Sequence, residues 1–268
     1  MFENFFNGDM MLIIAGLLIP IIGCVIGSAT VFLLKSDTNA PSQKFMLGFA
    51  AGVMLAAIIW SLMQPAMELA AEKDAIPWLS PTIGFLLGMG FLLLIDSITP
   101  HIHQSSDSVE GLPSKLQKST MLILAITIHH IPEGMAIGVV LSGAIEGGDM
   151  ITGATAIALS VGMALQNIPE GAVVSAPLNN MGVSKFKSFL MGSATGLVQP
   201  ISALITMLLI DGTMDIVPAI LAFAGGAMLY VIIEEIIPEG QSGKHSNVAT
   251  IGAALGFALM MILDGIFR

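Results

Sequence analysis

Eight long apolar segments limit what this sequence can fold into more than any other feature. A helix needs about 20 mostly apolar residues to cross a bilayer, and charged residues, Pro, Gly or Asn bound each run of that length. The runs cover roughly residues 10–34, 45–70, 76–96, 119–144, 151–178, 187–210, 216–237 and 247–266. This pattern predicts an all-α integral membrane protein with eight transmembrane helices, which form a single transmembrane domain over residues 1–268.

The composition excludes several other classes of protein. Only 10% of the residues are charged, against roughly 25% in an average soluble domain, which excludes an ordinary soluble enzyme. Disorder would need low hydrophobicity, and a net charge of −10 argues against a nucleic-acid partner. The single cysteine, Cys24, lies in an apolar run. Neither a disulfide framework nor a thiolate cluster is therefore available, and we interpret Cys24 as a helix-packing residue.

The positions of the basic residues predict an orientation. Short cytoplasmic loops collect Lys and Arg, and seven of the nine basic residues fall on one side of the predicted bundle: Lys35, Lys44, Lys115, Lys118, Lys185, Lys187 and Lys244. We therefore expect a multi-pass protein of the plasma (inner) membrane with both termini outside. The opposite side is acidic and would concentrate cations, although acidic residues also accumulate outside without any role.

Two related motifs place ionisable side chains in the middle of the fourth and fifth spans. They read HHIPEG at 129–134 and QNIPEG at 166–171. Charged groups in hydrocarbon cost several kcal/mol unless they are paired or coordinate an ion. The spacings i, i+3 and i+4 put three polar groups of each motif on one helix face. Two spans joined by a short loop are antiparallel neighbours, so these faces can meet in one site.

The donor types in these motifs indicate a metal site. Imidazole, carboxylate and amide oxygen suit borderline divalent ions such as Zn, Fe(II), Mn or Co. The alternative is a buried hydrogen-bond network that only joins helices. A third IPEG, at 237–240 and preceded by Glu234, Glu235 and Ile236, closes the seventh span at its cytoplasmic end, where it could also be a solvated acidic helix end.

With these motifs the chain resembles the ZIP (Zrt/Irt-like) family of divalent-metal transporters, and it looks most like the GufA-type prokaryotic branch. GFAAGVMLAA (48–57), GLVQPISAL (196–204) and GGAMLYVIIEEIIPE (225–239) extend the resemblance over nearly the whole chain. It implies a 3+2+3 arrangement of the eight helices, in which spans 1–3 and 6–8 form an inverted repeat. It also implies a binuclear metal site halfway across the membrane.

The resemblance further implies roles for individual residues. The first metal position would use His129, Glu133, Gln166 and Glu170, with Met54 as a thioether neighbour. The second would use His130, Glu133, Asn167, Glu170 and Gln199, with both glutamates bridging. The outer entrance would carry Glu68 and Asp264, and the cytoplasmic exit Asp96, His101, His103, Glu235 and Glu239. Many family members have an acid in place of Asn167 and Gln199, so we expect the second position to hold a dication less strongly.

These observations predict a transporter that moves divalent transition metal into the cytoplasm. Zinc is the expected substrate, with iron, manganese, cadmium or cobalt as further candidates. We expect no prosthetic cofactor, no enzyme activity and no nucleic-acid partner. The expected partners are divalent metal ions and the lipid bilayer, with a homodimer left open. A membrane-embedded metallo-hydrolase and a cation-selective channel are the alternatives. Glycine pairs such as Gly23 with Gly27, Gly84 with Gly88 and Gly252 with Gly256 fit either internal packing or a homodimer.

Overall fold

Eight membrane-length helical segments make up the structure, a computed structural model that describes residues 9–33, 40–73, 76–102, 109–146, 151–210, 213–243 and 246–267. Among these residues, the segments long and apolar enough to cross a membrane are Asp9–Leu33, Pro41–Glu72, Leu79–Ile98, Lys118–Ile145, Gly153–Asn180, Lys185–Ile210, Val217–Gln241 and Val248–Phe267. The prediction of an all-α membrane protein with eight spans is therefore confirmed. A two-residue antiparallel hairpin, β1 (His101–Ile102) with β2 (Val109–Glu110), follows the third span.

Five spans are single helices and three are built from pieces. The single helices are α1 (Asp9–Leu33), α4 (Leu79–Ile98), α5 (Lys118–Ile145), α6 (Gly153–Asn180) and α11 (Val248–Phe267). Span 2 consists of α2 (Ala40–Ala57), η2 (Ile58–Met63) and α3 (Gln64–Lys73). Span 6 consists of α7 (Lys185–Thr195) and α8 (Val198–Ile210). Span 7 consists of α9 (Val217–Val231), η4 (Ile232–Ile236) and α10 (Ile237–Gln241), and it follows a short 3₁₀ turn, η3 (Met214–Ile216).

The pieces η2 and η4 are π-helical turns inside otherwise α-helical spans. A π-turn inserts one extra residue into the helix and rotates the side chains that follow it, and such turns are frequent at functional sites. The turn η4 contains Glu234 and Glu235. The turn η2 contains Ser61. Glu235 lies with Asp96 and His101, and Ser61 hydrogen-bonds to Asp264.

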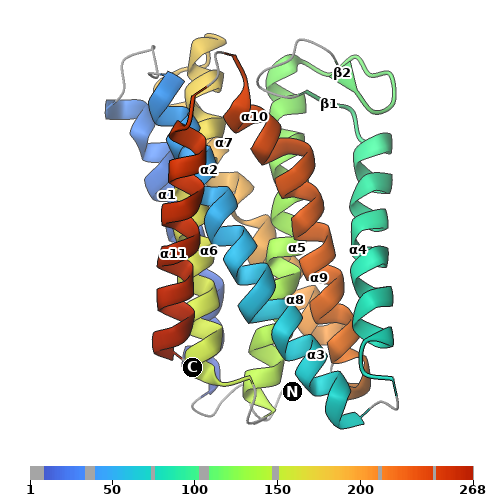
Figure 1. The fold of residues 1–268 in the computed structure, drawn as a ribbon. Helices are drawn as coiled ribbons and strands as arrows, with labels where there is room; N and C mark the ends of the chain where they lie inside the picture. The colour runs from blue at the N-terminus through green and yellow to red at the C-terminus, as the bar shows by residue number, and fades with distance from the viewer. Residues whose placement is uncertain are drawn as a thin grey trace.

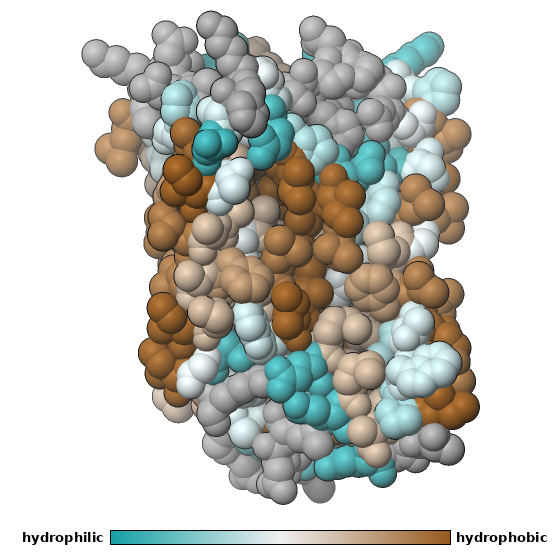
Figure 2. Space-filling view, viewed as in Figure 1, coloured by the Kyte–Doolittle hydropathy of each residue, from teal (hydrophilic) through white to brown (hydrophobic). Residues whose placement is uncertain are grey.

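The helices run up and down a bundle whose sides are apolar. The hairpin and α10 lie at one end of the bundle, and α11 ends at the other (Figure 1). Figure 2 shows a hydrophobic band across the middle of one face, with hydrophilic side chains towards both ends. This distribution matches a protein whose sides face lipid.

The helices α5 and α6 occupy the interior of the bundle. The α5 helix packs against α6, α8 and α9, and α6 packs against α1, α2 and α7. Both interior helices remain continuous through their prolines, Pro132 and Pro169. The two sequence motifs therefore lie in the core, where protein rather than lipid surrounds their polar groups.

Glycine pairs allow the outer helices to approach their neighbours closely. A Cβ added at Gly23 or Gly27 would overlap the backbone of Ala164 or Ile168 in α6. Gly84 and Gly88 meet the backbone of α9 in the same way, and Gly252 and Gly256 that of α2. These three pairs therefore serve internal packing, which decides one of the alternatives that the sequence left open.

Candidate metal centre

The two twin motifs meet inside the bundle. One ligand atom each from His130 and Glu133 of α5 and from Glu170 of α6 lie within 4.8 Å of one another. His130 and Glu133 are fully buried, and Glu170 is 6% exposed. Two carboxylates and an imidazole at this separation, shielded from water, could bind a divalent ion.

Amide side chains surround the carboxylate of Glu133. Gln166 Nε2 donates a hydrogen bond to Glu133 Oε1 at 2.7 Å, and Gln199 Nε2 donates to Glu133 Oε2. The Gln166 Oε1 atom is buried without a hydrogen-bond partner among the described residues. Gln166 therefore presents an unused amide oxygen beside the carboxylate, as a metal ligand would.

Asn167 and Gln199 hydrogen-bond mainly to each other. Asn167 Nδ2 donates to Gln199 Oε1 at 2.9 Å and also lies 2.9 Å from the backbone oxygen of Pro20 in α1. Gln199 Nε2 in turn lies 3.2 Å from Asn167 Oδ1. The amide pair thereby ties α6 to α8 and α1 without any net charge. Its oxygens are engaged with amide hydrogens, which is the arrangement expected for a helix-joining network.

One ring nitrogen of His130 lies close to both a thiol and a carboxylate. Its Nε2 atom lies 3.5 Å from Cys24 Sγ and 3.3 Å from Glu170 Oε2. The Glu170 Oε2 atom makes no hydrogen bond with the described residues, and neither does His130 Nδ1. The thiol of α1 therefore lies beside the ligand group formed by α5 and α6.

His129 faces away from this group towards span 7. Its Nε2 atom is paired with Glu235 Oε1 of η4. The structure thus separates the two adjacent histidines: His130 lies with Glu133 and Glu170, whereas His129 lies with an acid that sequence reasoning placed in the exit route. Glu235 thus connects α5 to span 7.

A second acidic and imidazole cluster continues from Glu235. One ligand atom each from Asp96, His101 and Glu235 lie within 4.8 Å of one another. His101 Nε2 is 3.1 Å from Asp96 Oδ1, and His101 Nδ1 is 2.9 Å from the backbone oxygen of Thr99. Tyr230 donates a hydrogen bond to Asp96 Oδ2 at 2.9 Å. Three of the five expected exit residues therefore gather at one place.

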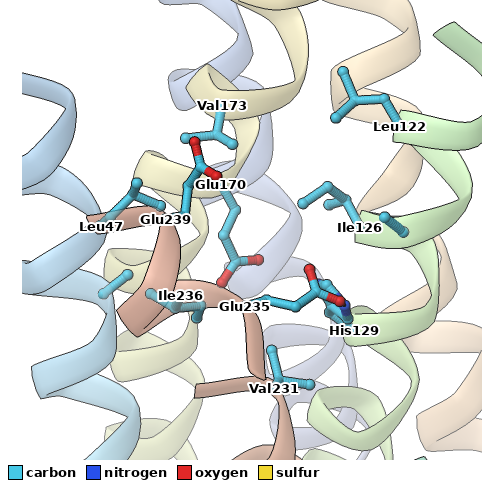
Figure 3. Close-up of a pocket in the computed structure, with 12 residues that line it drawn as sticks. Leu47, Leu122, Ile126, His129, Glu170, Val173, Val231, Glu235, Ile236 and Glu239 are labelled. Carbon is cyan, nitrogen blue, oxygen red and sulfur yellow. The ribbon is translucent and has the colours of Figure 1, made fainter. Parts of the chain in front are cut away.

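A cavity joins the central group to the end of the bundle that carries α10. Its walls come from α2, α5, α6 and span 7, and they include His129, Glu170, Glu235 and Glu239 together with apolar side chains such as Leu122. Figure 3 shows these acidic groups and His129 on the cavity wall among leucine, isoleucine and valine side chains. Glu239 thus lies on the same cavity as Glu170, although it belongs to the last turn of span 7.

The expected entrance residues lie towards the other end and differ from each other in exposure. Asp264 of α11 is 5% exposed, and Ser61 of η2 donates a hydrogen bond to its Oδ1 at 3.3 Å. Asp264 and Ser61 line a small pocket with Trp60. Glu68 of α3 is exposed and accepts a hydrogen bond from Gln64 at 2.7 Å. Only Asp264 of the two is enclosed by protein.

Two further expected site residues occupy different situations. Met54 of α2 is fully buried in the hydrophobic core of the bundle. Its role as a thioether neighbour of the metal stays a prediction. His103, expected in the exit route, lies outside the described residues.

Sequence reasoning missed two side chains of this region. Cys24, interpreted from sequence as a packing residue, contacts His130. Tyr230, the only tyrosine of the chain, holds Asp96. A signal for Cys24 was present, because it follows Pro20 by one helical turn in a span rich in glycine, where a thiol can approach another helix. Tyr230 carried no signal beyond its place before the third IPEG motif.

The comparisons with known proteins agree with the donor chemistry. A family model described as "ZIP Zinc transporter" matches residues 103–264. Zinc transporter ZIP11 of Homo sapiens is 32% identical, over 89% of this chain and 92% of that protein. Zinc transporter GufA of Myxococcus xanthus is 33% identical, over 87% and 90%, and Zinc transporter ZIPB of Bordetella bronchiseptica is 32% identical, over 84% and 72%.

Proposed function

This chain belongs to the ZIP family of zinc transporters, and from that premise we propose that it moves divalent transition-metal ions, zinc foremost, into the cytoplasm through a site between α5 and α6. Glu133 and Glu170 would be the shared ligands of this site. His129 and Gln166, with Met54 as neighbour, would complete a first position. His130, Asn167 and Gln199 would border a second.

The observation that carries this proposal is the pair of buried carboxylates from facing helices. Glu133 and Glu170 approach each other and His130 within 4.8 Å in the interior of the bundle. The lysine side chains that the structure describes all lie towards the bundle ends, so none of them neutralises the pair. Buried charges persist only when they are paired or coordinate a cation. A divalent ion supplies the missing positive charge.

The cavities support a route that leads to the α10 end. The inner cavity reaches His129 and Glu170, whereas the small pocket at Asp264 is lined by Val140 of α5. Glu133 and Val140 are seven residues apart, which is about 10 Å along a helix. Two buried side chains lie between the site and that pocket, Met163 on α6 and Ile137 on α5. The site therefore borders the cavity that leads to the α10 end, whereas buried side chains separate it from the pocket of Asp264.

Charge supports assigning the α10 end to the cytoplasm. Lys44, Lys118, Lys185 and Lys187 each lie within the first five residues of a helix that starts at that end. Acidic Glu72 and Glu146 lie at the opposite helix ends. Short cytoplasmic segments are enriched in Lys and Arg. Both termini would then face the outside of the plasma membrane, and metal would move inwards.

Internal sequence similarity supports the inverted repeat. GFAAGVMLAAIIWSL (48–62) and AFAGGAMLYVIIEEI (222–236) agree at seven of 15 positions, and their π-turns begin at the aligned residues Ile58 and Ile232. The packing pairs agree as well. Helix α1 packs along α6 while α8 packs along α5, and α2 packs along α11 while α9 packs along α4. A two-fold relation between spans 1–3 and 6–8, and between spans 4 and 5, reproduces these pairs.

The expected entrance and exit residues correspond to each other under the same two-fold relation. Ser61 aligns with Glu235, and Asp264 aligns with Asp96 when the glycine pairs of α11 and α4 are superimposed. Ser61 hydrogen-bonds to Asp264, and Glu235 lies in the cluster of Asp96. We therefore propose that the entrance and the exit are versions of one structural unit. The exit carries the additional acid.

Metal uptake by the purified chain tests the proposal. Proteoliposomes would be offered Zn, Fe(II), Mn, Cd and Co separately, with lipid-only vesicles as the control. We expect saturable accumulation that is greatest for zinc and rises steeply with temperature, as a carrier requires. Uptake no greater than in lipid-only vesicles for every metal would contradict the proposal. Flux that does not saturate would favour the channel alternative instead.

A further inference from the structure

We propose that Cys24 is a metal ligand, and that in this chain the second metal position is formed by Cys24, His130 and Glu170 rather than by the amides of Asn167 and Gln199. The inference deepens the proposed function and rests on it, because Glu170 is shared with the first position. It assigns the position a thiolate from α1. A thiolate would select soft and borderline ions.

The separations around His130 Nε2 carry the inference. In tetrahedral zinc sites the Zn–S distance is about 2.3 Å and the Zn–N distance about 2.0–2.1 Å, so sulfur and nitrogen ligands of one ion lie about 3.5 Å apart. Cys24 Sγ is 3.5 Å from His130 Nε2. A nitrogen and a carboxylate oxygen on one zinc ion lie about 3.4 Å apart by the same arithmetic. Glu170 Oε2 is 3.3 Å from His130 Nε2.

An unsatisfied oxygen points to a ligand at this place. Glu170 is only 6% exposed, and its Oε2 atom is buried without a hydrogen bond to the described residues. A buried carboxylate oxygen left without a donor costs free energy. Neither the thiol nor the imidazole satisfies it in the present arrangement. A cation bound to His130 Nε2 and Cys24 Sγ would satisfy it.

The amide side chains of Asn167 and Gln199 are poorly placed to act as metal ligands. Asn167 and Gln199 hydrogen-bond to each other, and Asn167 also donates to the backbone of Pro20. Binding a metal through their oxygens would break that network. Cys24 Sγ instead contacts His130 Nε2, which is itself a proposed ligand. A Cβ built at Gly196 would overlap Cys24 Sγ. Glycine at 196 leaves room for the thiol between α1 and span 6.

The thiol must lose its proton when the metal binds. The thiolate is the ligand form of cysteine, so each ion bound at Cys24 releases one proton. The inner cavity, whose wall includes Glu170, leads from this place towards the end of the bundle that carries α10. No oxidation or other covalent change of the sulfur is involved.

Cadmium binding to the purified full-length chain tests the inference. Cys24 is the only cysteine, so a thiolate-to-metal charge-transfer absorption in the ultraviolet can come from no other residue. We expect this band on adding Cd(II) to the wild type, its absence in Cys24→Ser, and its retention in Met54→Leu, which removes a thioether instead. The second equivalent of Cd(II) should bind at least about tenfold more weakly to Cys24→Ser.

Failure of this inference differs from failure of the proposed function. A wild-type protein without the band, whether or not it binds Cd(II), would overturn the role of Cys24 even if Cys24→Ser does not fold. Zinc uptake that persists in that case would leave the proposed function standing. A band at wild-type intensity after His130→Ala would also overturn the position, because the imidazole is its central ligand.

Discussion

His129 and Glu235 form a buried pair that joins the HHIPEG motif of α5 to the cluster of Asp96 and His101. His129 belongs to α5 and Glu235 to the π-turn η4 of span 7. Glu235 also lies with Asp96 and His101. The imidazole therefore stands between two groups of acids, Glu133 with Glu170 on one side and Asp96 with Glu235 on the other. Under the proposed function, a metal ion that leaves the centre would pass from one group of acids to the other without losing every protein ligand.

We predict that Glu235→Gln slows zinc uptake and leaves the equilibrium affinity for zinc at the Glu133–Glu170 site unchanged. A hydrogen bond to a charged group is worth about 1.5–3 kcal/mol, so uptake should fall about tenfold or more. Glu234→Gln is the matched control, because Glu234 is the preceding residue of the same π-turn and is exposed. Equal effects of the two substitutions would contradict a specific role for Glu235.

We predict that Gln199→Glu strengthens metal binding and lowers the stability of the metal-free protein. The new carboxylate would face Glu133, which now accepts a hydrogen bond from the Gln199 amide. Without metal, two facing acids repel each other, and the melting temperature in a chelator should fall. Zinc should raise the melting temperature of the variant more than that of the wild type, since a ligand stabilises by RT ln(1 + [L]/Kd). An unchanged response to zinc would show that Gln199 lies away from the metal.

We predict that Gly23→Ala destabilises the bundle by about 1–3 kcal/mol, the usual cost of overpacking a tight contact. The added methyl would overlap the backbone of Ala164. Gly90→Ala is the control, because a Cβ at Gly90 of α4 meets nothing within 4 Å. Thermal unfolding in detergent should show a lower melting temperature for Gly23→Ala alone. A change in oligomeric state without loss of stability would instead favour a dimer contact at α1.

We predict that a cysteine at Glu146 reacts with a membrane-impermeant maleimide from outside intact cells and that one at Ser114 does not. Both positions are exposed and lie at opposite ends of the bundle, next to the two ends of α5. A Cys24→Ser background removes the natural thiol. Ser114 should react only after the membrane is permeabilised. The reverse pattern would invert the orientation and the direction of transport.

The sequence predicted the number of helices because lipid requires about 20 apolar residues for each span. The span limits differ by up to four residues, as at Pro41 and Gln241, since helices extend beyond the apolar run. The π-turns η2 and η4 were missed, because their sequences remain compatible with an α-helix. Motif spacing also could not show that His129 turns to Glu235 while His130 stays with Glu170. That choice depends on span 7, which is distant in sequence.

Zinc uptake by Glu133→Gln and Glu170→Gln proteoliposomes tests the central claim most directly. Each substitution keeps the shape of the side chain and removes one of the two buried carboxylates. Glu146→Gln makes the same change at the exposed end of α5. We predict that uptake is lost in both buried variants, that Glu146→Gln transports as the wild type does, and that all three are recovered folded in equal amounts. Wild-type uptake in both buried variants would contradict the account.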